Sequence, residues 1–290
     1  MGNTFKSRIQ KIEKLPTLPE IAHQILNLTN DPLLSVDELK NIVEKDPAIS
    51  AKILSVANSA FFGVSVQTNI LGDAIARVGF NNVKNIAVGI SVLTLFGDGE
   101  ITSDYKRLFN HSVTVGLTAR WLGRNFKTII AEDILIDGLL HDLGYLVLSR
   151  YFPEIYQDIL RSFDSSTSLL DAEKDILGYT HADIGSMLAE QWNLPHTVLD
   201  AILYHHTPSL ARRNAKRVTI IHIADYIVSK NIFSPIEKDP NYPFDHCSHE
   251  ILGISDNTLK DIEETIKHIP LSDEIISMPQ DPKNRNMDLH

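Results

Sequence analysis

Helix-start signals followed by apolar residues at helical spacing are the feature that most restricts how this chain can fold. Thr17–Glu20 and Ser35–Glu38 both have the pattern of a capping box, in which the first and fourth residues bond to each other's backbone. Asp46-Pro47 places a capping side chain directly before a proline in the first helical turn. After each signal, apolar side chains recur every three or four residues, as they do along one face of a helix.

Patterns typical of strands are nearly absent. The run Val218–Ile223 is rich in β-branched residues and could be taken for a strand. We interpret it as helix, because Val218, Ile221 and Val228 repeat at helical spacing. The chain is therefore predicted to be all-α.

The charge of the chain is unevenly distributed. Lys and Arg number 27 against 37 Asp and Glu, so the net charge is −10 with His neutral. Residues 231–290 alone carry −7 of it. Duplex DNA and anionic membranes both attract proteins with an excess of cations, so neither is an expected partner.

Several other features point to the inside of a cell. No apolar stretch approaches the ~18–20 residues of a membrane span, and the N-terminus lacks the apolar core of a signal peptide. Cys247 is the only cysteine, which excludes an internal disulfide and a zinc site built on several thiolates. We expect a soluble, cytoplasmic protein.

The chain length and the positions of turn-forming residues indicate three regions. The segment Gly97–Glu100 is the best internal boundary, which gives an N-terminal helical half at 1–97 and a second helical half at 98–230. An acidic, partly helical C-terminal extension follows at 231–290. Within it we expect an irregular connection at 231–249, an amphipathic segment at Ile251–Ile269 and frayed residues from about Met278.

The most unusual feature of the composition is the number of histidines, which is twelve. A His-Asp pair alone carries little information, because composition predicts roughly one by chance, and a single histidine on an apolar face is more often a core residue than a ligand. A set with three members on apolar helix faces and the rest in adjacent pairs is more informative. We therefore favour a metal site over a group of core histidines, with these candidate ligands: His111, His141, Asp142, His181, His205, His206 and Asp225.

The carboxylates of this set make the strongest case for a metal. Asp225 falls on the apolar face of its predicted helix, and a buried charge must be paired, hydrogen-bonded or bound to a cation. The pair His141-Asp142 lies in Ile134–Leu148, which is apolar nearly all round and is predicted to be one helix at the centre of the core. Imidazole and carboxylate ligands without thiolates suit one or two ions of Fe, Mn, Ni or Zn.

The order of these residues resembles the HD superfamily of metal-dependent phosphohydrolases, and above all its HD-GYP branch. In the first half, four segments are similar to the hallmarks of the HDOD domain, an all-α relative of the HD domain found in bacterial signalling proteins: Leu15–Pro19, Asp46-Pro47, Ile53–Ala60 and Asp73–Gly79. The resemblance covers most of the chain, from about Ile12 to Asp225. It implies an HD-like multi-helix bundle with an N-terminal helical subdomain packed on it.

The resemblance also implies roles for the candidate ligands. The core metal site would consist of His111, His141, Asp142 and Asp225. Asp142 would be the carboxylate that bridges two ions and, in an active enzyme, the residue on which water activation depends. The second ion of binuclear members is held at positions that match His181, His205 and His206. The implied reaction is hydrolysis of a phosphoester, in which the cation lowers the pKa of a bound water.

Three departures from the HD-GYP pattern concern substrate handling and ligation. Those enzymes carry a lysine three residues after the His-Asp pair, where this chain has Tyr145. After the His-His pair they carry a glutamate and a Gly-Tyr-Pro element, where this chain reads Thr207-Pro-Ser-Leu. Arg107 stands where a further carboxylate ligand can occur. HDOD domains commonly lack a complete metal set and have no general activity assigned, so the full set of ligands here keeps an enzyme in consideration.

Two smaller features have a functional and a structural interpretation. Four cations lie between the His-His pair and Asp225, and they could bind the phosphate of a nucleotide or phosphoprotein or form a solvated helix start: Arg212, Arg213, Lys216 and Arg217. Asn58, close to Phe61-Phe62-Gly63, is expected to cap a helix or hold a neighbouring backbone, with the phenylalanines packed in the core or between the two halves.

The sequence supports two functions, in this order. The first is a stand-alone HDOD signalling module that binds a protein partner or a nucleotide and retains its metal site as a structural or sensory element. The alternative is a metal-dependent phosphohydrolase that acts on a cyclic dinucleotide, a nucleotide or another phosphoester. The metal pocket discriminates between them, because an enzyme needs an open coordination position beside basic side chains.

Overall fold

The structure is a computed structural model that describes residues 16–28, 32–59 (backbone only at 32–35), 62, 67–97, 102–126, 134–162, 167–231 and 242–268. These ranges form helices with short connections and contain no strand, so the predicted all-α class is confirmed. The run at 218–223 lies inside a helix, as predicted. Among the described helices, none combines the length and hydropathy needed to cross a membrane.

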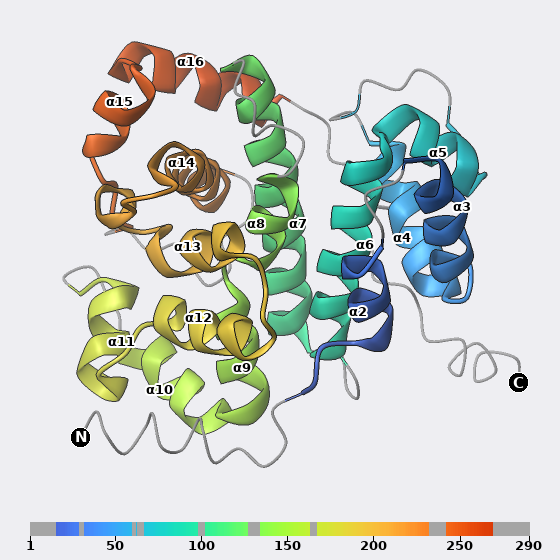
Figure 1. Cartoon of the computed structure of the whole chain (residues 1–290). Helices are drawn as coiled ribbons and strands as arrows, with labels where there is room; N and C mark the ends of the chain where they lie inside the picture. Colours follow the sequence, from blue (N-terminus) through green and yellow to red (C-terminus); the bar gives the residue numbers. More distant parts are fainter. Residues whose placement is uncertain are drawn as a thin grey trace, which may run out of the picture.

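The N-terminal subdomain is built around one long helix. Its elements are α2 (Glu20–Leu26), α3 (Pro32–Val43), α4 (Pro47–Ala57), α5 (Leu71–Val78) and α6 (Phe80–Leu95). Helices α2, α4 and α5 all pack on α6, which in turn packs on α8 of the second half. Figure 1 shows these helices together on one side of the molecule. The predicted arrangement of a helical subdomain packed on a second helical bundle is confirmed.

The second bundle carries the predicted ligands. Its elements are α7 (Ser103–Asn125), α8 (Ile134–Leu140), α9 (Leu143–Tyr151), α10 (Pro153–Ser162), α11 (Leu169–Leu177), α12 (His181–Gln191), α13 (His196–Tyr204), the 3-10 turn η3 (Pro208–Leu210), α14 (Ala215–Asn231), α15 (Cys247–Leu252) and α16 (Asp256–Lys267). Helix α7 packs along both α8 and α14, and α12 packs on both α9 and α13 (Figure 1). Every residue of α8 is buried, which places this short helix at the centre.

The C-terminal extension covers the second bundle. Leu259, Ile262 and Ile266 of α16 are buried in an apolar cluster with residues of α7 and α14. The predicted amphipathic segment contains the end of α15 and the whole of α16. The two helices are separate because Gly253 adopts a left-handed φ of 67° after α15 and the Ser255 side chain then caps α16. The predicted irregular connection also ends earlier than 249, since α15 begins at Cys247.

Of the three predicted helix starts, only the one at Asp46 is correct. Its carboxylate accepts hydrogen bonds from the backbone nitrogens of Ala48 and Ile49, at 2.9 and 3.0 Å. The capping box at Thr17–Glu20 is wrong: α2 begins at Glu20, because the proline at 19 disfavours a helical conformation for the residue before it. The start at Ser35 is also wrong, because α3 already begins at Pro32, and proline suits a first helical turn.

The prediction of one helix over Ile134–Leu148 is corrected as well. The chain leaves the helical path at His141 and Asp142, which form a turn between α8 and α9. The turn lets the ring of His141 fold back, so that its Nδ1 lies 2.8 Å from the carbonyl oxygen of Gly138. Burial does not reveal such a break, since residues on both sides of it are fully enclosed.

Asn58 holds a neighbouring backbone, as predicted. It ends α4 and exchanges two hydrogen bonds with the backbone of Thr68, both 2.9 Å long. Phe62 packs against the core, and the guanidinium of Arg120 from α7 lies 4.0 Å from the centre of its ring. Phe61, Gly63, residues 98–100 of the predicted boundary and the tail from Met278 lie outside the described residues, so the domain boundaries remain predictions.

Candidate metal centre

The seven predicted ligands come together in the interior of the second bundle. His111 lies in the middle of α7, His141 and Asp142 form the turn after α8, and His181 is the first residue of α12. His205 and His206 form the turn after α13, and Asp225 lies in α14. All seven residues are buried, with an exposed fraction of 9% or less. Five separate segments thus contribute to one buried cluster.

The first group of ligand atoms surrounds a space of the size of one ion. Nε2 of His111 lies 3.3 Å from Nε2 of His141, 3.4 Å from Oδ2 of Asp142 and 3.1 Å from Oδ1 of Asp225. Nε2 of His141 lies 3.3 and 3.6 Å from the same two oxygens. An ion about 2.1 Å from each ligand separates neighbouring ligand atoms by roughly 3.0–3.4 Å. The group therefore fits one metal ion of this size.

A second group of ligand atoms lies on the other side of Asp142. Nε2 of His181 lies 3.1 Å from Nε2 of both His205 and His206. Oδ1 of Asp142 lies 3.3 Å from Nε2 of His181 and 3.6 Å from Nε2 of His205. One oxygen of Asp142 thus faces each group, which is the geometry of a carboxylate that bridges two ions.

Hydrogen bonds direct the lone pairs of three histidines into the cluster. Nδ1 of His141 lies 2.8 Å from the Gly138 carbonyl oxygen, and Nδ1 of His205 lies 2.8 Å from that of Ile202. A carbonyl oxygen only accepts, so both Nδ1 atoms carry a hydrogen and donate it. Nδ1 of His181 faces the carboxylate of Glu173 in the same way, at 2.9 Å. Outer hydrogen bonds of this kind leave Nε2 available for a metal.

The cluster also attracts positive charge. Burial lowers the pKa of His205 and lowers that of His206 well below its usual value, so these rings stay neutral. Burial alone would lower the pKa of His181 too, but the carboxylates of Glu173 and Asp142 outweigh it and raise the pKa to about 10. The carboxylates of the cluster can be neutralised by protons or by a metal ion. Protons and metal compete for the same lone pairs on the histidine nitrogens.

Close backbone contact fixes the position of His181 relative to Asp142. Gly144, in the first turn of α9, lies against the start of α12, and a Cβ atom at position 144 would stand 1.9 Å from the carbonyl oxygen of His181. Gly138 and Gly116 form a similar contact between α8 and α7, where a Cβ on Gly138 would lie 2.5 Å from the Cα of Gly116. The glycines therefore let the helices that carry the ligands approach one another.

Two side chains that support His181 were not predicted as part of the site. Glu173 of α11 is fully buried, and Oε2 lies 2.7 Å from the backbone nitrogen of His181. Tyr145, at the position where HD-GYP enzymes carry lysine, stacks on the His181 ring with centroids 3.9 Å apart. A signal for Glu173 was present, because it shares the apolar face of α11 with Leu169, Ala172 and Leu177.

Asp225 is held from outside the cluster by the C-terminal extension. Tyr242 donates its hydroxyl to Oδ2 of Asp225, and its ring centroid lies 5.4 Å from that of His206. The Ser229 hydroxyl donates to Oδ1 of Asp225 at 3.0 Å. Tyr242 lies in an irregular stretch without periodicity, so no sequence signal indicated it.

His222 supports His205 from the opposite side. Its Nδ1 lies 2.7 Å from the carbonyl oxygen of His205, and its Nε2 accepts from the backbone nitrogen of Asp245, 3.0 Å away. The carboxylate of Asp245 in turn accepts from the backbone nitrogen of Ser209 at 3.1 Å. A chain of hydrogen bonds thus joins the His-His turn to η3 and to the extension.

The four predicted phosphate-binding cations do not form one group. Arg217 is buried and pairs with the carboxylate of Asp137 on α8. Lys216 is exposed. Arg212 and Arg213 are exposed as well and line a separate cavity beside α13, in which none of the seven candidate ligands takes part. Of the four cations, only Arg212 and Arg213 therefore share the wall of one cavity.

One known protein family matches most of the chain. The model of the HDOD domain matches residues 15–208. An uncharacterized protein of Treponema pallidum (strain Nichols) is 28% identical over 201 residues, which cover 68% of this chain and 38% of that protein. The chain thus spans well under half the length of this relative.

Solved structures share the fold. An HDOD domain protein with unknown function from Geobacter sulfurreducens aligns over 93% of this chain and 98% of its own, with 21% identity and a TM-score of 0.73. A protein from Shewanella amazonensis SB2B, named a "putative phosphohydrolase", aligns over 91% of this chain and 93% of its own, with 21% identity and a TM-score of 0.67. At these identities the likeness concerns the fold alone.

Proposed function

Because this chain belongs to the HDOD domain family, we propose that it is a signalling module whose buried two-ion metal centre keeps the second bundle in the conformation that binds a partner or ligand. The observation that carries the proposal is the complete and enclosed ligand set, with Asp142 between two groups of histidines. Metal binding to such preassembled ligands adds directly to folding stability.

The donor set supports a transition metal in this role. Five imidazoles and two carboxylates converge without a thiolate, which favours Fe, Mn, Ni or Zn over magnesium or calcium. When bound, such an ion would act as a Lewis acid and neutralise negative charge. Glu173, Gly138 and Ile202 would hold the histidine rings through Nδ1, while Tyr242 and Ser229 would hold the carboxylate of Asp225.

The surroundings of the centre favour a regulatory role over hydrolysis. The ligands are enclosed, and Tyr242 bonds to one of them from the side of the extension. The basic side chain of Arg217 is neutralised by Asp137, and the residue three positions after the His-Asp pair is Tyr145, stacked on a ligand ring. A phosphoester substrate needs access to the ion and unpaired basic side chains beside it. These contacts provide neither.

A thermal shift and an activity assay on the same protein test the proposal. We expect Zn²⁺ or Mn²⁺ to raise the Tm of the metal-depleted chain by at least about 5 °C, since binding to the native state alone stabilises it. We expect hydrolysis of p-nitrophenyl phosphate and bis-p-nitrophenyl phosphate no faster than that of a His141→Ala/Asp142→Ala variant. A metal-depleted chain whose Tm does not respond to Zn²⁺, Mn²⁺, Fe²⁺ or Ni²⁺, each added in turn, would contradict the proposal.

A metal-dependent phosphohydrolase is the second candidate. The observation that favours it is the position of Asp142, whose two oxygens face His141 and His181 and would suit a ligand shared by two ions, because two-ion centres are common in enzymes that hydrolyse phosphoesters. Substrates would be cyclic dinucleotides, nucleotides or other phosphoesters. Turnover of either nitrophenyl ester that disappears in the His141→Ala/Asp142→Ala variant would establish this function in place of the first.

A further inference from the structure

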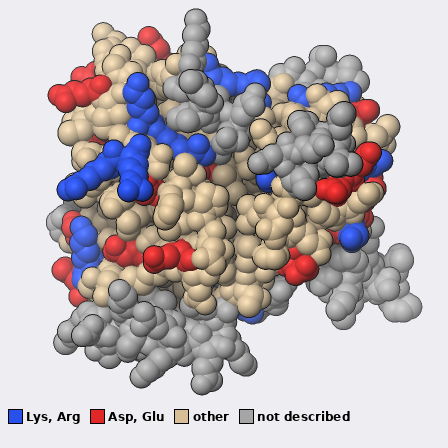
Figure 2. Space-filling view, viewed as in Figure 1, with Lys and Arg blue, Asp and Glu red and all other residues tan. Residues whose placement is uncertain are grey.

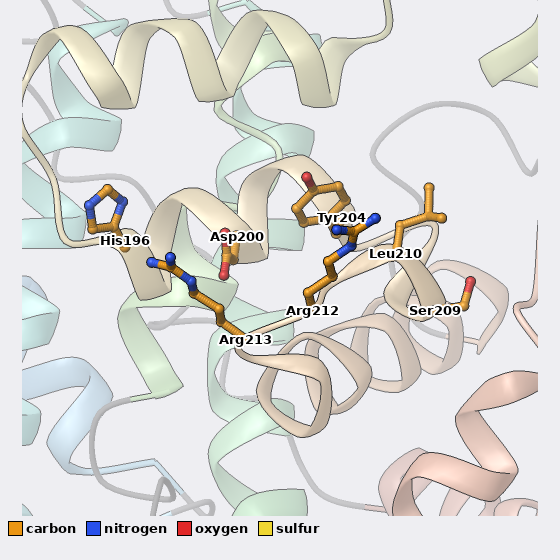
Figure 3. A pocket seen from close by; sticks show the side chains of 7 residues that line it. All are labelled: His196, Asp200, Tyr204, Ser209, Leu210, Arg212 and Arg213. Carbon is orange, nitrogen blue, oxygen red and sulfur yellow. The ribbon is translucent and has the colours of Figure 1, made fainter.

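A polar cavity of about 720 Å³ lies between α13, η3 and the connection that leads from η3 to α14 (Figure 3). Its walls consist of His196, Asp200, Tyr204, Ser209, Leu210, Arg212 and Arg213. Cavities that take small organic ligands typically measure about 300–1,000 Å³. This one is therefore large enough for a ligand of nucleotide size, and it is separate from the metal centre.

The charge of the cavity is opposite to that of the chain. Arg212 and Arg213 are exposed, and neither has an ion-pair partner within 4 Å among the described residues. Asp200 is the one acidic residue of the wall, and its carboxylate accepts a hydrogen bond of 2.7 Å from the Asn214 amide. Figure 2 shows Lys and Arg side chains gathered on the face formed by α13 and the start of α14. In a chain of net charge −10, this local excess of cations selects for an anion.

The remaining wall offers surfaces for a flat, partly apolar group. Tyr204, Leu210 and Arg212 line the same cavity, and Figure 3 shows them towards the same end of it. Leu210 is 60% exposed and adds apolar surface to the wall. A ring system placed there would contact Tyr204 and Leu210 while its charged groups meet the arginines.

We propose that this cavity binds a phosphorylated small molecule of the nucleoside diphosphate class. Arg212 and Arg213 would bind phosphate oxygens, because the planar guanidinium presents two parallel donors that match a phosphate. Tyr204 and Leu210 would contact the base. The inference rests on the proposed function in that it gives the signalling module its ligand. Ser209 of the same wall leads through Asp245 and His222 to the backbone of His205.

Isothermal titration of the full chain with ADP and with inorganic pyrophosphate tests the proposal. We expect one ADP site per chain, and a loss of affinity of at least tenfold for both probes in Arg212→Ala/Arg213→Ala. The control is Arg161→Ala/Lys174→Ala, which removes two exposed cations from α10 and α11 and should leave both affinities unchanged. Tyr204→Leu should weaken ADP by at least threefold and leave pyrophosphate unaffected.

A comparison with the metal-site variant separates this site from the metal centre. His141→Ala/Asp142→Ala should bind ADP more weakly, because the metal centre supports the conformation of the bundle, but it should lose further affinity when Arg212→Ala/Arg213→Ala is added. Arg212→Ala/Arg213→Ala alone should retain its metal content and Tm, since both arginines are exposed. Absence of ADP binding to the parent chain would overturn the proposal, as would affinities that Arg212→Ala/Arg213→Ala leaves unchanged. ADP binding that depends only on His141 and Asp142 would also overturn it, and would assign the nucleotide to the metal centre.

Discussion

Oε2 of Glu173 lies 2.9 Å from Nδ1 of His181 and 2.7 Å from its backbone nitrogen, so a single carboxylate orients both the ring and the first turn of α12. Glu173 is not a candidate ligand itself, because its carboxylate faces the outer nitrogen of the ring. Its contribution is therefore to direct Nε2 of His181 towards His205, His206 and Asp142.

Glu173→Gln is expected to weaken metal binding on the His181 side. The amide keeps the size of the side chain but removes the charge that draws a hydrogen to Nδ1, and changes of this kind typically cost about 10–100-fold in metal affinity. Titration of the metal-depleted chain with Zn²⁺ measures the effect. Glu190→Gln, at an exposed position of α12, is the matched control, and equal affinities in the two variants would show that Glu173 does not support the ligand.

Gly144→Ala is expected to disrupt the metal centre through its backbone. The added Cβ would stand 1.9 Å from the carbonyl oxygen of His181, so α9 and α12 must separate. We expect a loss of about 3 kcal/mol or more in the free energy of unfolding, together with loss of metal.

Gly72→Ala provides the control for that substitution. Gly72 lies in α5, and a Cβ atom added there would have no heavy atom within 4 Å, so alanine should be neutral or stabilise by about 0.5–1 kcal/mol. Chemical denaturation and elemental analysis of both variants check the pair. A Gly144→Ala variant as stable and as metal-rich as the parent would contradict the close contact of the two helices.

Tyr242→Phe is expected to release metal faster. The substitution removes the hydroxyl that donates to Asp225, and a hydrogen bond to a charged group contributes about 1.5–3 kcal/mol. We expect transfer of metal to a chelator to accelerate by roughly tenfold. Tyr226→Phe removes a neighbouring hydroxyl whose partner is Lys230 at 3.3 Å, and it should leave the rate unchanged. Equal rates in the two variants would show that the extension does not restrain the centre.

Lys52 is expected to make stability depend on pH above neutrality. Burial lowers its pKa from 10.5 to about 8, so the unfolded chain binds more protons than the folded chain between these values. The free energy of unfolding should then rise as pH increases from about 8 towards 10, because the penalty for burying the charge disappears.

Lys52→Met should remove that rise and stabilise the chain at pH 7 by up to about 3 kcal/mol, the equivalent of a shift of this size. Urea denaturation at pH 7, 8, 9 and 10 measures both effects. Lys45→Met, at an exposed position before α4, should leave the profile as it is. A Lys52→Met profile that rises as steeply as that of the parent would contradict this account of the lysine.

Burial patterns predicted the candidate site better than they predicted its supports. Asp225 was identified because a buried charge on an apolar helix face needs a partner, and it lies in the cluster. The same reasoning applied to α11 would have identified Glu173. Tyr242 could not be predicted from the sequence. It lies in an irregular segment, and its contact with Asp225 is a tertiary one that no local sequence pattern indicates.

Helix boundaries were harder to predict than helices. The break at His141-Asp142 was hidden because apolar residues continue on both sides of it, and it depends on a hydrogen bond from His141 to Gly138. The pairing of Arg217 with Asp137 joins residues of two helices far apart in the chain, so a run of cations in the sequence could not show which member is buried.

The most direct test of the central claim is the metal content of the purified chain beside that of His141→Ala/Asp142→Ala. The account predicts about two equivalents of Fe, Mn, Ni or Zn in the parent and almost none in the variant, because Asp142 faces both groups of ligands. A folded parent chain that holds no metal, even after anaerobic reconstitution with each of the four ions, would contradict it.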